Sequence, residues 1–159
     1  MREEPKYQIP EKGKTVWRLY GIIETIIAII FAGIISFLTF KFNFPPFVYY
    51  IATAVVVLVG ILTIWLFPNI RWKIWRYEVR EQEIEIQSGL FIVKRTLIPM
   101  VRVQHVDMGQ GPILKKYDLA NISISSAATT HIIPMLVTAD ADALRAKISE
   151  LAKVAEDDV

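Results

Sequence analysis

Cysteine is absent from this chain of 159 residues. Its absence excludes disulfide bonds, a thiolate nucleophile, and zinc or iron–sulfur sites built from cysteine. The chain has two histidines, His105 and His131, and neither has an acidic cluster at ligand spacing beside it. We therefore predict no metal site and no cofactor.

An excess of charge of one sign is also lacking. The 18 Lys and Arg residues nearly balance the 16 Asp and Glu residues, for a net charge of +2. This balance excludes the strongly basic surface of a nucleic-acid-binding protein. Charged residues make up 21% of the chain, hydrophobic residues make up 53%, and the mean hydropathy is +0.39. Such a composition excludes a disordered chain and is too apolar for an ordinary soluble protein of this length.

Two long apolar runs account for the hydrophobic excess. Residues 19–40 contain Glu24 as their only charged side chain, and residues 47–67 contain none. At a rise of 1.5 Å per residue, each run forms a helix about 30 Å long, which matches the hydrocarbon core of a bilayer. We predict a transmembrane hairpin of two helices over residues 19–67, joined by an external loop at 41–46. Pro45 and Pro46 stop helix continuation in that loop.

The distribution of Lys and Arg predicts the orientation of this hairpin. Five of them lie in residues 1–18, only Lys41 lies in the loop, and basic residues resume after the second run. Because basic flanks remain on the cytoplasmic side, we expect a multi-pass protein of the bacterial plasma membrane with both termini, and a short tail at 1–18, in the cytoplasm. Arg71, Lys73 and Arg76 are candidate contacts to anionic lipid headgroups, or serve only to set this topology.

Residues 69–159 are numerous enough to form a cytoplasmic domain with its own core. Alternation of apolar and polar residues predicts antiparallel strands at 75–79, 83–87, 90–97, 101–106, 120–125 and 132–137. The apolar period then changes to helix spacing at Ala141, Leu144, Ile148 and Leu151. We predict an α+β domain in which one amphipathic helix covers one end of a curved antiparallel sheet.

Specific stretches of this domain carry a family resemblance. They are residues 98–106 (IPMVRVQHV), 111–120 (GPILKKYDLA) and 122–127 (ISISSA), followed by the closing helix. They resemble the bacterial pleckstrin-homology-like domain of "membrane-flanked" proteins, and two spans followed by one such domain look like the small YdbS-like members of that family. The resemblance implies an antiparallel β-sandwich or barrel capped by a C-terminal helix. One departure is Tyr117-Asp118, which stands where the family often has glycine and affects the turn rather than the fold.

The resemblance also implies partners and a cellular role. Members of this family act in the cytoplasmic membrane beside a larger, multi-span relative that carries repeated copies of the domain. They are similar to components of cell-envelope defence, a role with no assigned reaction. We accordingly expect the bilayer and a multi-span protein with related domains as partners, with an anionic lipid as a further candidate.

The first apolar run contains two candidate features. Small side chains recur on one helical stripe, which is a candidate packing surface for the second span or for a helix of a partner, because small residues let backbones approach closely in lipid. The stripe consists of Gly21, Thr25, Ala28, Ala32 and Ser36. Glu24 is a candidate intramembrane polar site, or it reaches the headgroups and pairs with Arg18 or Arg71.

In the domain, Arg102 and Gln104 are candidates to line a ligand or peptide groove, with help from Lys115 and Lys116. The alternative is that these side chains satisfy turn carbonyls and form ion pairs. A phosphoinositide site of the eukaryotic type needs a basic first hairpin, whereas this hairpin carries the four acidic residues Glu78, Glu81, Glu83 and Glu85. We therefore exclude such a site.

No pairing of a nucleophile with a base and no phosphate-binding glycine loop is present in the sequence, so we predict that the protein is not an enzyme. The leading hypothesis is a membrane-anchored adaptor in cell-envelope defence or in resistance to membrane-active antimicrobials. It would assemble with a larger membrane protein that bears similar domains. The alternative is a lipid- or amphiphile-handling subunit of a membrane transport complex, in which Glu24 and the basic residues near the membrane contact headgroups.

Overall fold

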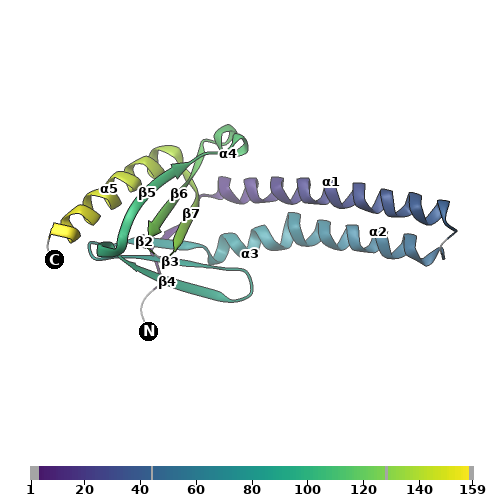
Figure 1. Cartoon of the computed structure of the whole chain (residues 1–159), viewed down its shortest axis with the longest axis horizontal. Helices are drawn as coiled ribbons and strands as arrows, with labels where there is room; N and C mark the ends of the chain where they lie inside the picture. Colours follow the sequence, from purple (N-terminus) through teal and green to yellow (C-terminus); the bar gives the residue numbers. More distant parts are fainter. Residues whose placement is uncertain (1–3, 44, 128, 158–159) are drawn as a thin grey trace. The chain divides into compact units, whose positions relative to one another are not determined.

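The computed structural model describes residues 4–43, 45–127 and 129–157 (Figure 1). These residues form two compact units. One is a helical hairpin from Trp17 to Ile70. The other, which we call the β-domain, combines the described residues up to Val16 with those from Arg71 onwards.

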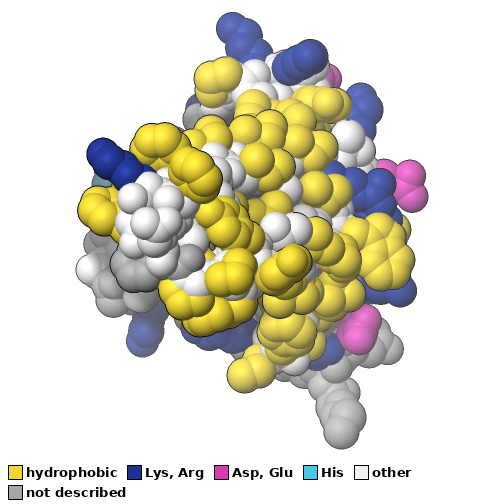
Figure 2. All heavy atoms as spheres, turned by 90° about the vertical axis from the view of Figure 1, so that its right-hand side faces the viewer, with side chains coloured by type: hydrophobic (Ala, Val, Ile, Leu, Met, Phe, Trp, Pro, Cys, Tyr) yellow, Lys and Arg dark blue, Asp and Glu magenta, His cyan; other side chains and the backbone are white. Residues whose placement is uncertain are grey.

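The hairpin consists of two long apolar helices, as predicted. The first is α1 (Glu11–Lys41), and the second runs without interruption through α2 (Phe47–Gly60), the π-helical η1 (Ile61–Leu66) and α3 (Phe67–Ile74). They contain 31 and 28 residues with mean hydropathies of 2.4 and 2.5 over their most apolar windows, so both are long enough to cross a membrane. Hydrophobic side chains cover most of the face seen when the hairpin is viewed from its loop end (Figure 2).

The second helix is longer than the predicted span 47–67, because it continues through Pro68. Proline inside a helix lacks an N–H donor, and its ring clashes with the carbonyl four residues earlier. The π-helical turn directly before Pro68 widens the helix, and the Phe67 N–H bonds to the Leu62 carbonyl, five residues back. This wider turn accommodates the ring without ending the helix.

The β-domain contains two antiparallel sheets. The first has the order β1 (Tyr7–Gln8), β2 (Arg76–Val79), β3 (Glu83–Gly89) and β4 (Val93–Pro99), and the second has the order β5 (Val103–Gly109), β6 (Leu119–Ser126) and β7 (Thr130–Val137). Short helices η2 (Met100–Arg102) and α4 (Pro112–Lys116) join strands, and α5 (Thr138–Asp157) closes the domain (Figure 1). The predicted α+β architecture is confirmed.

The core lies between the two sheets and α5. Alternate residues of β3 and β6 face inward, among them Ile84, Ile122 and Ile124, which are fully buried. Ala141 and Ile148 of α5 pack against the same cluster, which is the helix face that the spacing predicted.

The N-terminal segment of residues 4–16 belongs to the β-domain, whereas the sequence predicts only a tail over residues 1–18. Ile9 is only 2% exposed, and its carbonyl accepts a hydrogen bond of 2.9 Å from Trp72 Nε1. Gln8 Nε2 in turn donates to the Trp72 carbonyl at 2.8 Å. These contacts join the chain before the helical hairpin to the chain after it.

The structure differs from the predicted strand at 101–106 and shows the turn at Tyr117-Asp118 in detail. The strand predicted at 101–106 is wrong at its start, because Met100, Val101 and Arg102 form the 3-10 turn η2 after Pro99 and the strand begins at Val103. The departure at Tyr117-Asp118 leaves the turn intact. Asp118 adopts a left-handed φ of 56° after α4, a conformation that aspartate tolerates better than most residues.

Candidate functional site

A groove of about 460 Å³ opens in the β-domain between the edge strand of one sheet and the β6–β7 hairpin of the other. Side chains from the end of β4, from η2, from the start of β5 and from the hairpin line it. They are Leu97, Ile98, Pro99, Val101, Arg102, Gln104, Ser126, Ala127, Thr129 and His131. The groove is large enough for a few side chains of a bound segment.

Arg102 and Gln104 reach the groove through irregular backbone rather than as alternate residues of one strand. Arg102 ends the 3-10 turn, and Gln104 lies at a register shift, since Val103 pairs with Ser126 and His105 pairs with Ser125. A bulge of this kind redirects a side chain and often borders a functional site. The structure therefore brings these two predicted groove residues together.

Strand β4 forms the exposed edge of its sheet beside the groove. It pairs with β3 on one side, and no strand among the described residues pairs with its other side. Leu97 and Val101 at this edge are 46% and 51% exposed. An open edge next to side-chain pockets is the geometry that accepts an added strand from another protein.

The lining of the groove favours a partner rich in hydrogen-bond acceptors. Arg102 supplies a permanent cation, Gln104 supplies an amide, and the described lining includes no carboxylate. His131 Nε2 lies 3.0 Å from Thr129 Oγ1 within the hairpin. Among the described residues no group of three or more His, Asp or Glu side chains is placed to hold a metal ion.

The remaining basic candidates lie elsewhere. Lys115 and Lys116 are exposed in the last turn of α4 and do not line the groove, so the structure does not bring them to Arg102. Lys73 is exposed in the last turn of α3, together with Arg71. Arg76, by contrast, is half-buried in β2, and its Nε lies 3.5 Å from the Glu4 carboxylate.

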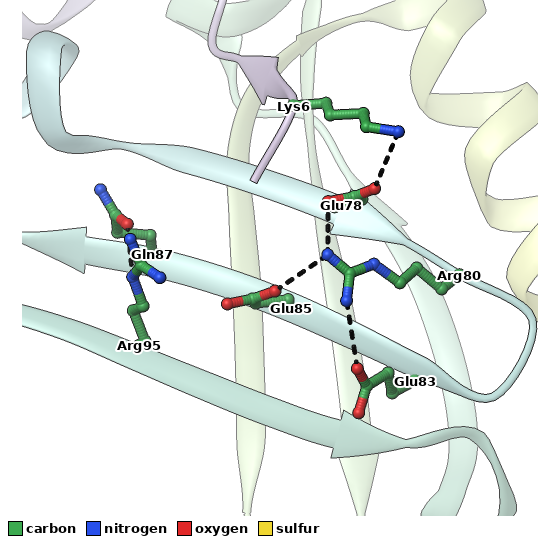
Figure 3. Close-up of polar contacts among 7 residues, drawn as sticks. All are labelled: Lys6, Glu78, Arg80, Glu83, Glu85, Gln87 and Arg95. Carbon is green, nitrogen blue, oxygen red and sulfur yellow. Dashed lines mark hydrogen bonds and ion pairs between the residues drawn. The ribbon is translucent and has the colours of Figure 1, made fainter. Parts of the chain in front are cut away.

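The acidic first hairpin, β2–β3, is organised around Arg80 (Figure 3). Glu78 and Glu85 are directly opposite each other on β2 and β3 and are only 7% and 1% exposed. Arg80 Nη2 lies 2.9 Å from Glu78 Oε2 and 3.4 Å from Glu85 Oε2, and Arg80 Nη1 lies 3.4 Å from Glu83 Oε1. One guanidinium thus offsets the repulsion between two facing carboxylates.

This cluster also shifts the pKa of Glu78. The hydrogen bond from Arg80 lowers the pKa of Glu78, and the charges of Arg80 and Lys6 lower it further against the opposing effect of burial. Lys6 Nζ, from the N-terminal segment, lies 3.8 Å from Glu78 Oε1. Three of the four carboxylates of this hairpin, those of Glu78, Glu83 and Glu85, are thus engaged by Arg80.

In the helical hairpin, the small-residue stripe faces the second helix. Gly21 is buried, and Thr63 Oγ1 donates to the Gly21 carbonyl at 3.3 Å. Thr25 Oγ1 lies 3.4 Å from Thr63 Oγ1, while Ala28 and Ala32 line an apolar cavity of about 380 Å³ between the helices. Ser36, the last member of the stripe, is half-buried.

Glu24 lies outside this stripe on an exposed face of α1. Arg18, one of its two candidate partners, has its Nη2 atom 3.5 Å from Asn69 Oδ1.

Comparison with known proteins places this architecture in a family. The model of the family described as "Bacterial PH domain" matches residues 19–152, which is most of the chain. The chain belongs to the bacterial PH domain family. Its PH-like domain is the β-domain described above, and the sandwich capped by a helix that the resemblance implied is confirmed.

Two relatives from Bacillus subtilis extend this result. The UPF0699 transmembrane protein YdbS is 50% identical over 159 residues, which cover the whole of both chains. The UPF0699 transmembrane protein YdbT is 30% identical over 70 residues, which are 43% of this chain and 14% of that much longer protein. No solved structure is significantly similar. The YdbS-like identity that the sequence predicts is confirmed, and the chain is a membrane protein.

Of the ten residues that line the groove, sequence reasoning predicted only Arg102 and Gln104, and it missed, among others, His131 and Leu97. They belong to different sheets, and only the tertiary fold brings the end of β4 beside the β6–β7 hairpin. No local periodicity indicates such a juxtaposition. The burial of Glu85 was missed for a related reason, since a charged residue on an alternating strand is typical of a solvated face.

Proposed function

We propose that the protein is a non-enzymatic, membrane-anchored adaptor that assembles with a larger membrane protein bearing similar domains. The observation that carries this proposal is the likeness to both a small and a large transmembrane relative, one matching over the full length and the other over a 70-residue segment. A segment shared by a short and a long membrane protein of one organism supports recognition between related domains. The role in cell-envelope defence or in resistance to membrane-active antimicrobials is part of this proposal.

The proposed topology has both termini in the cytoplasm, with spans at 19–40 and 47–67 and the PH-like domain from residue 69. Packing within the β-domain supports it. Residues 4–16 precede the hairpin and pair with β2 and Trp72, which follow it. Two segments that fold together lie on one side of a membrane, which requires an even number of spans between them. The abundance of Lys and Arg on both flanks favours the cytoplasmic side.

The groove beside β4 is the proposed recognition site of this adaptor. The open edge of β4 offers main-chain hydrogen bonds to an extended segment, and Leu97 and Val101 offer apolar contacts beside Arg102. Anchoring in the bilayer raises the local concentration of a partner in the same membrane, so a modest groove is sufficient.

Co-purification tests the proposal. The tagged chain is extracted in mild detergent, and co-purifying proteins and lipids are identified by mass spectrometry, for the wild type and for Arg102→Glu and Lys115→Glu. We expect a stoichiometric multi-span protein with a PH-like segment, several-fold depleted by Arg102→Glu. Lys115→Glu is the matched control, since it reverses the same charge outside the groove and should leave the partner in place.

Two outcomes count against the adaptor. If the wild-type chain is recovered without any co-purifying protein, the proposed partner does not exist. Equal recovery of the partner with both variants retains assembly but removes the groove as its site.

A lipid- or amphiphile-handling role is the second candidate, and the apolar cavity between the helices favours it. The cavity of about 380 Å³ is lined by side chains of both helices, including Ala28, Ala32 and Ala52, and its volume suits an acyl chain. One enriched lipid that co-purifies with the chain, and is lost in Ala32→Phe, would support this candidate. If Glu24→Gln leaves resistance to membrane-active agents intact, Glu24 has no part in it.

A further inference from the structure

We propose that the turn between β3 and β4 inserts into the bilayer that anchors the chain. Four consecutive apolar residues, Leu90 to Val93, form what we call the apolar tip. Phe91 and Ile92 are 77% and 83% exposed, and Val93 is 51% exposed. A run of exposed apolar residues on a water-facing turn is unfavourable unless something covers it. This inference is independent of the adaptor role.

The tip has a defined conformation that presents these side chains outward. Gly89 pairs with Val93 across the hairpin and has a φ of 148°. A Cβ on Gly89 would overlap the Ile92 carbonyl oxygen and lie 3.2 Å from Val93 Cα. Glycine at this position therefore lets the chain close tightly, and Phe91 and Ile92 of the tip remain exposed.

The register of the sheet shows which end carries the tip. Gln87 pairs with Arg76, the first residue of β2, and Arg76 follows the end of α3 at Ile74 after a single residue. Strand β3 then continues through Ser88 and Gly89, so the tip projects roughly 7 Å beyond the start of β2 at about 3.3 Å per residue. The tip thus lies at the end of the sheet at which β2 begins, one residue after α3 ends.

The turn at the opposite end of the same sheet is charged and polar rather than apolar. The turn between β2 and β3 consists of Arg80, Glu81 and Gln82, of which Glu81 and Gln82 are exposed. One end of the sheet is therefore apolar and the other is charged. A membrane surface at the apolar end and water at the charged end match this polarity.

A basic side chain adjoins the tip, and a second lies shortly before the start of β2; both support lipid as the occupant. Lys94 follows the tip directly and is exposed, and Lys73 is exposed in the last turn of α3. Apolar residues that enter the acyl region beside cations that contact headgroups are the pattern of a bilayer-inserting surface. A dry protein interface is depleted in lysine and supplies no comparable reason for a cation directly beside the apolar residues.

The absence of cysteine from the chain makes a direct test possible. Ile92→Cys is labelled with an environment-sensitive fluorophore, and the full chain is reconstituted as a single copy in nanodiscs of phosphatidylcholine and phosphatidylglycerol. Glu81→Cys, at the opposite end of the same sheet, is the matched control. Nitroxide-bearing lipid and aqueous iodide serve as the two quenchers, and Phe91→Cys provides an independent second position on the tip.

We expect the label at Ile92 to be quenched several-fold more by nitroxide lipid than the label at Glu81, and several-fold less by iodide. Iodide quenching equal to that at Glu81, at both tip positions, would overturn the proposal by showing the tip in water. Protection from both quenchers would also overturn it, because protein rather than lipid then covers the tip.

Discussion

Gly21→Ala tests the close approach of the two helices in the hairpin. Gly21 belongs to the small-residue stripe, and the backbone of the second helix approaches it closely. A Cβ added there would overlap the Thr63 carbonyl oxygen, and it would lie 2.6 Å from the Thr63 carbonyl carbon and 3.0 Å from the Ile64 nitrogen. Ordinary van der Waals contact begins at 3.4 Å, so the helices must separate locally by roughly 1 Å.

The loss of stability expected for Gly21→Ala has two contributions. Inserting a methyl group into a packed site costs about 1–3 kcal/mol. Separation also weakens the hydrogen bond from Thr63 Oγ1 to the Gly21 carbonyl and the contact between the Thr25 and Thr63 hydroxyls, and bonds of this kind between membrane helices contribute about 0.6 kcal/mol each. We expect a destabilisation of about 2–4 kcal/mol in total.

Gly33→Ala is the matched control on the same helix. A Cβ at Gly33 meets no heavy atom within 4 Å, so this substitution changes helix propensity without a clash. Equilibrium unfolding of the full chain in mixed micelles, titrated with a denaturing detergent and followed by tryptophan fluorescence, compares the two variants. Gly21→Ala should unfold at a clearly lower detergent fraction. Equal midpoints for the two variants would refute the close packing of the helices at Gly21.

Three further predictions concern the β-domain. Arg80→Met should lower the melting temperature at pH 7. The difference in melting temperature between this variant and the wild type should become smaller below about pH 4.5. The reason is that a carboxyl group whose pKa is lowered in the folded state, as that of Glu78 is, stabilises the fold above that pH and loses this contribution on acidification. A difference in melting temperature that does not change with pH would contradict this reasoning. Asn121→Ala should cost about 1–3 kcal/mol in thermal unfolding, because Asn121 Oδ1 accepts the N–H of buried Met135 at 2.9 Å, whereas Asn121→Asp should retain most of the stability. Trp72→Phe removes the hydrogen bond to the N-terminal segment and should accelerate limited proteolysis before residue 11, while an unchanged cleavage rate would argue against anchoring by Trp72.

Local patterns in the sequence were sufficient for most of the fold. The two apolar runs, the alternation around Ile84 and Ile86, and the helix spacing of Ala141 and Ile148 each depend on residues close together in the chain, so their periods predict the elements directly. The pairing of Tyr7 with Tyr77 has no such signal. A strand of two residues is too short for periodicity, and its partner lies 70 positions away.

The candidate groove was predictable only in part, and for physical reasons. The proximity of Arg102 and Gln104 follows from their closeness in the sequence, but their orientation depends on a 3-10 turn and a bulge that the alternation at Val101 and Val103 does not reveal. Lys115 was grouped with them by charge alone, whereas α4 carries it away from the groove. Charge similarity indicates the chemistry of a site and not its position.

The N-terminal segment links the fold of the domain to the insertion of the helices. Tyr7 and Gln8 hydrogen-bond with β2, and Lys6 adds a cation to the acidic hairpin, yet the two apolar helices separate these residues from their partners in sequence. In the proposed topology both helices must cross the membrane before this segment reaches β2. Failure of either helix to insert would leave the edge of β2, the indole N–H of Trp72 and the carboxylate of Glu78 without these partners. In that topology, insertion of only one of the two helices would leave the PH-like domain incomplete, which would couple the proposed recognition surface to correct membrane insertion.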